Sequence, residues 1–299
     1  MKVASILTIG AAGLASAAPT VKRALTDADI LQFALTLEHL EDKFYREGLA
    51  NYTEADFASA GFDSTFYNNL KTVSSDETTH VDFLTKGLTA AGAKPVDECV
   101  YAFPSTDPKS FVMVSSILEG VGVSAYLGAA ASIMSKEYLT DAGSILTVEA
   151  RHSSYIRAAL SESPFPQPFD DPLSPNEVYT LASSFIVSCP STNVALPFKA
   201  FPALTLDPST PSPIKEGDKV TLLTEGYKVV TQVQGQQLYG AFITVTGPIF
   251  VPATIVDGGI SLSIPAGVNG QSYVVLTGCN TVVDDTTVGA GPAIIEITN

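Results

Sequence analysis

Two copies of one short pattern, Glu77-Thr-Thr-His80 and Glu149-Ala-Arg-His152, limit the possible fold of this chain more than any other feature. Residues three apart on an α-helix share a face, so each copy directs a carboxylate and an imidazole toward one point. The chain has only 3 histidines, and two of them stand in this pattern. We therefore expect two helices whose Glu–His pairs face the interior of a helical bundle.

The region from residue 24 to residue 190 predicts a helical domain with five helices. The first begins at Thr26, with Asp29 in the capping-box position, and runs to about Gly48. The others are expected over about 62–91, from Pro108 to about 136, over about 138–161, and from Ser174 to about Cys189. Proline-rich or glycine-containing stretches separate these segments, as is usual for connections in a bundle.

Charged residues stand on the apolar faces of these helices, at positions where leucine would be expected. In the second helix one face follows the 3–4 spacing of a core stripe, and it carries Phe66, Leu70, Val73, Glu77, His80, Leu84 and Leu88. The fourth helix repeats this pattern, with Glu149 and His152 on the face that also carries Ile145 and Ile156. Both Glu–His pairs are therefore expected inside the bundle.

The other two long helices each carry a glutamate in an apolar setting. The stretch 111–134 has Glu119 as its only charge, and Glu38 and Glu41 lie on one face of the first helix. Stretch 111–134 is long enough to cross a membrane, but its serines, glycines and central acid fit a buried bundle helix, so no membrane span is expected. A carboxylate buried alone is very costly, so it must be paired, protonated or bound to metal. Arg151 is the only basic residue beside the motifs and lies off their shared face, which favours metal binding over a network of buried acids and histidines.

The order Glu38, Glu77-x-x-His80, Glu119, Glu149-x-x-His152 resembles the ferritin-like superfamily. The stretches ALTLEHLEDKFY, SSDETTHVDFL and VEARHSSYIR are similar to its secreted fungal branch, which is related to stress-response and desiccation-associated ferritin-like proteins. The resemblance covers about residues 26–190 and implies a four-helix bundle plus a fifth helix. It also implies a pair of metal ions in each chain. Glu38, Glu77 and His80 would serve one ion, and Glu119, Glu149 and His152 the other, with two of the glutamates bridging.

The six candidate ligands and the residues near them indicate which metal the site would bind and which reaction it would support. Carboxylates and imidazoles in this ratio suit iron or manganese better than zinc or copper. The resemblance implies oxidoreductase chemistry on peroxide or dioxygen, of a catalase-like or oxidase-like kind. Tyr45 and Tyr126, each seven residues beyond a glutamate of the set, are expected either to donate hydrogen bonds to it or to be ordinary core tyrosines. Glu41 is a candidate for an extra ligand, a proton relay or a solvent-facing acid.

Two other functions stay open at this point. The first is a metal-binding stress-protection protein in which the site holds metal without turnover. The second is a cell-wall-associated binding protein in which the C-terminal region is active and the bundle is a scaffold. An enzyme needs an open coordination position and a path from solvent, whereas a structural metal site is closed.

The helical period ends near Pro190, and residues 191–299 predict an antiparallel β-sandwich of immunoglobulin-like size. Short segments rich in β-branched residues are separated by Gly, Pro and Asp turns, and they are KVTLLTE, AFITVTG, GISLSIP, SYVVLTG and AIIEITN. Aromatic residues are too few here for a carbohydrate-binding surface, so most of them are expected to pack inside. The region is still a candidate site for a cell-wall or protein partner.

The N-terminal residues predict secretion. Residues 1–18 have one lysine, an apolar stretch and small residues before Ala18, which is the pattern of a signal peptide. Residues 19–23 form a short pro-segment that ends in the dibasic pair Lys22-Arg23. We therefore expect an extracellular or cell-wall glycoprotein, and the N-glycosylation sequon Asn51-Tyr-Thr53 agrees with this.

Charge and cysteine content narrow the choice of partners and compartment. The formal net charge of −15 argues against nucleic acid or anionic membranes as partners. Three cysteines fit an oxidising compartment. A Cys99–Cys189 bridge would tie the connection between the second and third helices to the end of the bundle and leave Cys279 over. However, three cysteines allow three different single bridges.

Overall fold

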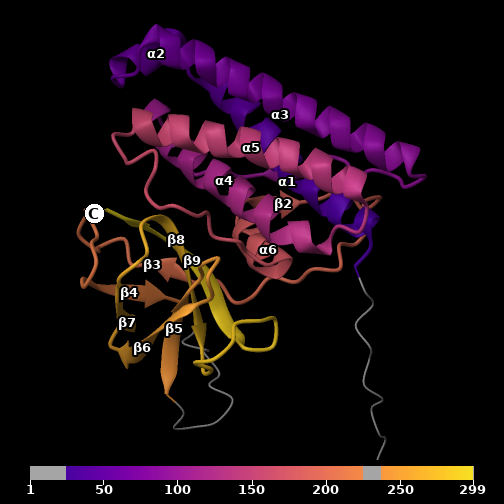
Figure 1. Cartoon of the computed structure of the whole chain (residues 1–299). Helices are drawn as coiled ribbons and strands as arrows, with labels where there is room; N and C mark the ends of the chain where they lie inside the picture. Colours follow the sequence, from indigo (N-terminus) through magenta and orange to yellow (C-terminus); the bar gives the residue numbers. More distant parts are fainter. Residues whose placement is uncertain (1–24, 225–236, 299) are drawn as a thin grey trace, which may run out of the picture.

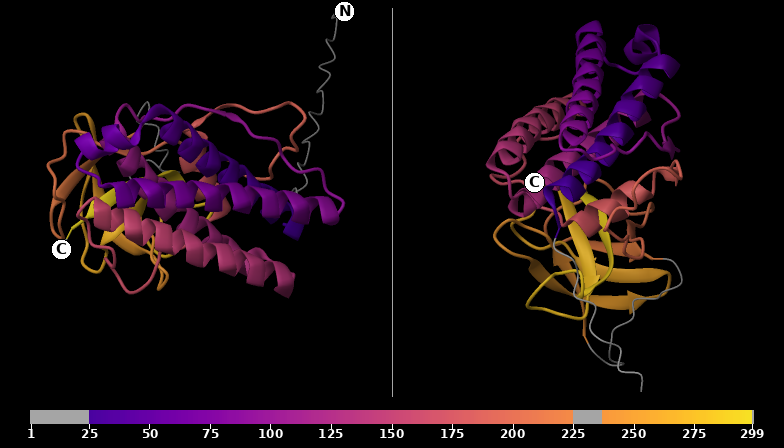
Figure 2. Two further views of the ribbon diagram at one scale, coloured as in Figure 1. Left: turned by 90° about the horizontal axis from the view of Figure 1, so that it is seen from above. Right: turned by 90° about the vertical axis from the view of Figure 1, so that its right-hand side faces the viewer.

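The computed structural model describes residues 25–224 and 237–298, which form a helical domain followed by an antiparallel β-sheet domain (Figure 1). Figure 2 shows the helices on one side of the molecule and the sheet on the other. The predicted fold class, a helical bundle with an additional helix and then an antiparallel β-domain, is confirmed. The predicted signal peptide and pro-segment, residues 1–23, lie outside the described residues.

Four long helices build the bundle, and each begins with a side-chain cap. They are α1 (Asp27–Asn51), α3 (Ser64–Ala90), α4 (Pro108–Ala129) and α5 (Lys136–Ala159). As predicted, Thr26 and Asp29 form a capping box at the start of α1. α1 packs along α3 and α4 packs along α5, so the bundle consists of two helix pairs that meet in the centre.

The sequence prediction was wrong at the end of the third predicted helix. α4 ends at Ala129 and is followed by the 3-10 turn Ala130–Ser132, so the helix does not reach residue 136. The carboxylate of Asp27 accepts the backbone N–H groups of Met134 and Ser135, at 2.7 and 3.0 Å. These bonds hold the chain in a corner, and the Ser135 side chain then caps α5.

The prediction was also wrong at the end of the fifth helix and omitted one short helix. α6 (Pro175–Ser183) stops before Cys189 because the chain continues as strand β2 (Ile186–Ser188), which pairs antiparallel with β1 (Val100–Tyr101). The omitted helix is α2 (Glu54–Ser59), whose capping box of Thr53 and Asp56 was a visible sequence signal.

The disulfide joins Cys99 to Cys189, one of the three pairings that the sequence allowed. Cys99 lies beside β1 and Cys189 beside β2, so the bridge fastens the connection between α3 and α4 to the end of α6. Cys279 is a free thiol and is half-buried.

The β-domain is one curled antiparallel sheet. Its strands are β3 (Thr205–Leu206), β4 (Lys219–Leu223), β5 (Leu238–Phe242), β6 (Ile249–Val256), β7 (Gly259–Ser263), β8 (Gly270–Thr277) and β9 (Val288–Ile297). The strand order is β3-β4-β7-β6-β5-β8-β9. The two edge strands approach each other, and the Gly291 N–H donates to the Pro202 carbonyl at 2.9 Å, so the sheet nearly closes into a barrel or sandwich.

All five predicted strand segments overlap strands of this sheet, namely β4, β5, β7, β8 and β9, but the overlap with β5 is short. The segment 241–247 was predicted as a strand, but β5 ends at Phe242 within it. The reason is a tight turn in which the Gly247 N–H donates to the Thr244 carbonyl at 3.0 Å. Gly247 has a φ of 109°, a conformation that favours glycine.

The two domains share a hydrophobic core. Phe33 of α1 and Val121 and Ala125 of α4 belong to the same buried cluster as Tyr273 and Val275 of β8. Buried apolar contact of this kind fixes the two domains relative to each other. The β-domain is therefore packed against the bundle rather than attached by a loose linker.

Polar contacts strengthen this junction between the domains. The Tyr273 hydroxyl donates to the Gly120 carbonyl at 2.9 Å, and Gln271 Nε2 donates to the Ile117 carbonyl at 3.1 Å. In the same part of the interface, Arg157 forms two hydrogen bonds with the carboxylate of Glu296, the cross-strand neighbour of Gln271, at 2.9 and 2.7 Å. Gly120 directly follows Glu119, so the sheet contacts the bundle next to the candidate site.

One helical segment in the described part of the chain, Pro108–Ser132, is long and apolar enough to cross a membrane by length and composition. In its most apolar window, 67% of the residues are buried inside the protein. Core helices of soluble proteins meet the same criterion, and α4 packs against α1, α5 and α6.

Candidate metal centre

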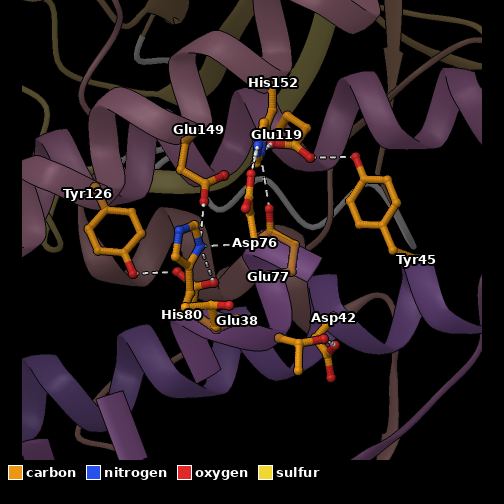
Figure 3. Close-up of polar contacts among 12 residues, drawn as sticks. Glu38, Asp42, Tyr45, Asp76, Glu77, His80, Glu119, Tyr126, Glu149 and His152 are labelled. Carbon is orange, nitrogen blue, oxygen red and sulfur yellow. Dashed lines mark hydrogen bonds and ion pairs between the residues drawn. The ribbon is translucent and has the colours of Figure 1, made fainter. Parts of the chain in front are cut away.

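Six predicted residues from all four long helices meet in the centre of the bundle (Figure 3). They are Glu38 of α1, Glu77 and His80 of α3, Glu119 of α4, and Glu149 and His152 of α5. The four glutamates are 0% exposed and the two histidines 8%. The helical spacing of the two Glu-x-x-His patterns, on otherwise apolar faces, brings these side chains together.

The Nδ1 atoms of the two histidines each lie among carboxylate oxygens. His80 Nδ1 is 3.2 Å from Glu38 Oε2, 3.1 Å from Glu77 Oε2 and 3.4 Å from Glu149 Oε1. His152 Nδ1 is 3.1 Å from Glu77 Oε1 and 3.3 Å from Glu119 Oε2. Glu77 therefore contacts both histidines, one with each of its oxygens.

These side chains form two groups that could each hold a metal ion. The first group is Glu38, Glu77, His80 and Glu149, and the second is Glu77, Glu119, Glu149 and His152. In each group the donor atoms lie within 4.8 Å of one another. The groups share Glu77 and Glu149, so these two are the glutamates placed to bridge. Glu38 and Glu119 belong to one group each.

The hydrogen-bonding state of the cluster fits metal binding. Five of its buried atoms have no hydrogen-bond partner among the described residues, and they are Glu77 Oε1, Glu119 Oε2, both oxygens of Glu149 and His152 Nδ1. Buried polar atoms are nearly always hydrogen-bonded in native proteins, so a group of atoms without hydrogen bonds that face one another calls for a common partner. Oxygen and imidazole donors in this ratio suit iron or manganese.

The protonation of the cluster reflects burial and the closeness of the carboxylates. Burial raises the pKa of Glu77 to about 7, although the nearby imidazoles of His152 and His80 lower it. Burial and the charges of Glu77 and Glu119 raise the pKa of Glu149 well above its usual range. Burial lowers the pKa of His152, but the nearby carboxylates of Glu119 and Glu77 outweigh this and raise it to about 11. Without metal the cluster therefore holds several protons, which bound cations would displace.

The two predicted tyrosines lie at opposite ends of the cluster (Figure 3). The Tyr45 hydroxyl donates to Glu119, and the Tyr126 hydroxyl donates to Glu38. Each tyrosine thus crosses to the glutamate of the other helix pair. Burial raises the pKa of both tyrosines well above the usual range, and the facing glutamate raises it further, so both remain hydrogen-bond donors.

Asp76 is a neighbour of the site that sequence reasoning missed. His152 Nε2 lies 3.2 Å from Asp76 Oδ2, so a carboxylate orients the far side of this imidazole. Asp76 directly precedes Glu77 in the sequence, and this adjacency was the available signal. The corresponding position before Glu149 is Val148, so only one of the two histidines can have such a partner from this position.

Glu41 lies close to the cluster but belongs to neither donor group. It is 5% exposed, so it is not a solvent-facing acid. Burial raises the pKa of Glu41 well above its usual range, and the charges of Glu149 and Glu38 raise it further. His39, the third histidine, points away from the site, with Nε2 3.1 Å from the Val96 carbonyl oxygen.

A solvent-facing cleft of about 450 Å³ reaches the two histidines between α3 and α5. His80 and His152 form part of its floor, and Asp76, Arg151 and Tyr155 are among its other lining residues. Arg151, predicted to lie off the site, is exposed at this cleft. The cluster is therefore buried but can be approached from solvent on its histidine side.

Comparison with known proteins agrees with this architecture. Residues 26–162 match a family model described as a ferritin-like domain. A curated relative, Protein rds1 of Schizosaccharomyces pombe (strain 972 / ATCC 24843), is 26% identical over 180 residues. The match covers 60% of this chain and 44% of the S. pombe protein, so it spans less than half of that relative's length. The helical domain described above is thus a ferritin-like domain, with the donor cluster at its centre.

Proposed function

We propose that this protein binds two iron or manganese ions per chain and uses them for oxidoreductase chemistry on peroxide or dioxygen. The ligands are Glu38, Glu77, His80, Glu119, Glu149 and His152. The observation that carries the proposal is that two donor groups share Glu77 and Glu149, with five buried donor atoms that have no hydrogen bond among the described residues. Bridging carboxylates are the means by which such bundles hold two ions together.

Charge balance supports two divalent ions rather than a network of acids and histidines alone. Four buried carboxylates are neutralised by two divalent cations when both imidazoles are uncharged, which is the form of histidine that binds metal. Burying a neutral assembly avoids the large desolvation penalty of isolated charges. In the described structure, the ion pairs of the four glutamates are all with His80 and His152, with no Lys or Arg among them.

A bound iron or manganese pair would supply one-electron redox chemistry and Lewis-acid activation of a bound oxygen species. The protein residues contribute the surroundings. Tyr45 and Tyr126 donate to Glu119 and Glu38 and so hold these two carboxylates in orientation. Asp76 orients His152, and Glu41 is a buried carboxyl close enough to the cluster to give or take a proton.

Metal content measured by plasma mass spectrometry tests the binding part of this proposal. The protein should be secreted from a eukaryotic host with iron and manganese supplied, and two ions per chain are expected. Glu77→Gln and His152→Ala should each reduce the content strongly. His39→Gln and Glu137→Gln are matched controls outside the cluster and should keep both ions. A folded wild-type protein without metal would refute the proposal.

The redox part requires a separate measurement. Peroxide dismutation and dioxygen consumption should exceed the rate of the same concentration of free metal ions, and Glu77→Gln should lose this excess. The cleft at His80 and His152 supports catalysis over a purely structural site, because a structural site is closed to solvent. A loaded protein with no turnover would favour metal holding or stress protection instead.

Secretion is part of the proposal and is supported by two features of the described chain. The Cys99–Cys189 disulfide fits an oxidising compartment, and Asn51 of the glycosylation sequon is exposed. Expression in a fungal host should place the protein in the medium or cell wall, with a mass that falls after glycosidase treatment. An unglycosylated product that stays inside the cell would refute this part.

A further inference from the structure

The two helix pairs repeat one arrangement. In α1 and α3 a glutamate, Glu38, is followed seven residues later by Tyr45, and the partner helix carries a Glu-x-x-His pattern. In the other pair, α4 carries Glu119 followed seven residues later by Tyr126, and α5 carries the Glu-x-x-His pattern of Glu149 and His152. Each tyrosine donates to the glutamate of the other pair, so the repeat has approximate two-fold character. Positions at which the two helix pairs differ therefore indicate a feature that the repeated metal-ligand arrangement does not explain.

The repeat fails three residues after each unshared glutamate. Glu41 stands three residues after Glu38, whereas Gly122 stands three residues after Glu119. A Cβ atom at Gly122 would lie 2.8 Å from Glu149 Oε2 and 3.0 Å from Glu41 Oε1. The glycine thus leaves the space that the Glu41 carboxyl occupies beside Glu149, and an alanine would require one of these acids to move.

Glu41 is buried without a polar partner. It is 5% exposed, and it makes no hydrogen bond or ion pair of its own with any residue in the described ranges 25–224 and 237–298. A buried carboxyl, charged or neutral, loses its hydrogen bonds to water and is costly unless another group replaces them. The Glu41 oxygens are not among the fully enclosed atoms without a hydrogen bond, so the carboxyl is accessible from the cavity beside it and can hydrogen-bond to a molecule there.

A cavity of about 200 Å³ adjoins Glu41 and Gly122. Its walls are otherwise largely apolar and include Leu40, Leu118, Val121, Ala182, Phe185 and Ile294. Of the described residues that line it, Glu41 alone is ionisable. α1 and α4 form its inner wall, while the end of α6 and strand β9 contribute the outer residues, of which Ser184 is exposed. This is not the polar cleft between α3 and α5.

We propose that this cavity binds a small, neutral, single-ring molecule with one hydroxyl group, a simple phenol, whose hydroxyl hydrogen-bonds to Glu41. An apolar cavity of about 150 Å³ in another protein holds benzene, so 200 Å³ accommodates one ring with a substituent. Apolar walls and the nearby acids exclude an anion. The inference deepens the proposed function by naming a substrate class, and it rests on that function only for the reaction of the bound molecule, not for binding.

Calorimetric titration of the full-length protein with phenol and with benzene tests this inference, in metal-loaded and chelator-treated samples. We expect one phenol site per chain, with phenol bound about tenfold more tightly than benzene because of the hydrogen bond. Glu41→Leu should remove this preference by weakening phenol binding about tenfold while benzene still binds. Glu47→Leu, an exposed glutamate on the same helix, is the matched control and should leave both affinities unchanged.

A second pair of variants tests the location. Ala182→Phe fills the cavity from α6 and should abolish binding of both probes. Because Ala182 is buried and this variant could misfold, Ser184→Trp at the exposed rim serves as the alternative and should weaken both probes. Binding of phenol that is unchanged in Glu41→Leu and Ser184→Trp overturns the inference, and so does folded wild-type protein that binds neither probe at millimolar concentration.

Metal content measured on the same samples separates this inference from the proposed function. Phenol binding as expected in a protein that takes up no metal would refute the di-metal proposal and leave the cavity assignment standing. A protein that holds two ions but binds no phenol would refute only the cavity assignment. A shift of the metal's absorption or magnetic spectrum on addition of phenol, absent in Ala182→Phe or Ser184→Trp, would show that the bound molecule lies beside the metal ligands.

Discussion

The interiors of the two domains are built on opposite principles. The core of the β-domain contains Leu222, Phe242, Val274 and Ile295, with hydrophobic residues throughout the cluster to which they belong. The centre of the bundle contains four completely buried glutamates and two nearly buried histidines. Apolar burial stabilises a fold, whereas buried charge destabilises it unless something neutralises it. The bundle also has buried apolar clusters, so the comparison indicates that both domains are stabilised by apolar burial and that the bundle alone accommodates a destabilising site at its centre.

The junction between the domains explains how the bundle tolerates this site. Tyr273 and Gln271 of β8 hydrogen-bond to backbone carbonyls of α4 on either side of Glu119, and Arg157 of α5 pairs with Glu296 of β9. The sheet therefore supports the two helices that carry Glu119, Glu149 and His152. The β-domain is therefore in contact with the half of the bundle that carries three of the six candidate ligands.

The largest effect is expected from damage to the β-domain core. Phe242 is 0% exposed, and Phe242→Ala should lower the free energy of unfolding by about 3–5 kcal/mol through lost burial and a cavity. Urea denaturation of the full-length protein measures this. A loss below about 1 kcal/mol would show that the β-domain does not carry the stability that we assign to it.

The pH dependence of the metal-free protein should reveal the destabilising charge in the bundle. The folded pKa of Glu77, about 7, exceeds its ordinary value of 4.5, so its contribution to stability is complete below pH 4.5 and is lost as pH rises to about 7. The pKa of His152 is raised from 6.5 to about 11, so its contribution to stability is also lost with rising pH, between pH 6.5 and 11. Unfolding free energy in chelator should therefore fall with rising pH, by about 3 kcal/mol for Glu77.

Metal should reverse this trend, because protons compete with metal for the same donor atoms. The rise in melting temperature on metal addition should grow as pH increases from 5.5 to 7.5. Scanning calorimetry at several pH values, with and without chelator, provides the comparison. A metal-induced shift that is independent of pH would contradict the involvement of these ligands.

Replacing a shared carboxylate by an apolar side chain should change the free energy of unfolding less, and the change should be stabilising rather than destabilising. In chelator, Glu149→Leu should leave stability unchanged or raise it by about 1–4 kcal/mol, because a buried acid without a hydrogen bond is removed. The same variant should lose metal binding. Glu137→Leu, an exposed position on the same helix, should change stability by less than about 0.5 kcal/mol. Marked destabilisation of the metal-free Glu149→Leu protein would show that the cluster holds the fold together as a polar network.

The smallest effect is expected at the domain junction. Tyr273→Phe removes the hydroxyl that contacts Gly120, Ser124 and Gln271, and it should cost about 1–2 kcal/mol. Because Gly120 adjoins Glu119, metal affinity should fall in parallel, which titration with iron or manganese can measure. Unchanged metal affinity in a destabilised variant would show that the sheet stabilises the bundle without positioning its ligands.

The sequence predicted the helical fold and the membership of the cluster because charges on an apolar helical face are visible as a pattern. Glu77, His80, Glu149 and His152 interrupt stripes of leucine and valine, and Glu119 is the one charge in a long apolar stretch. All six expected residues meet in the structure. Their role as metal ligands remains a prediction.

Other features depend on how the helices cross, which no single helix encodes. Helical spacing does not show that Glu77 and Glu149 are the shared pair, nor that Tyr45 reaches Glu119 rather than Glu38. The contact of Asp76 with His152 joins two different helices in the same way. Gly122 resembles any small residue of a packed helix until the position of Glu41 is known.

Anomalous X-ray diffraction at the iron and manganese absorption edges tests the central claim most directly. Crystals of the full-length protein grown with each metal should show two anomalous peaks in the bundle, one beside His80 Nδ1 and one beside His152 Nδ1. Glu77 and Glu149 should lie between the peaks and contact both. Crystals of folded protein with no peak at these positions, or with metal only on the surface, would contradict the account.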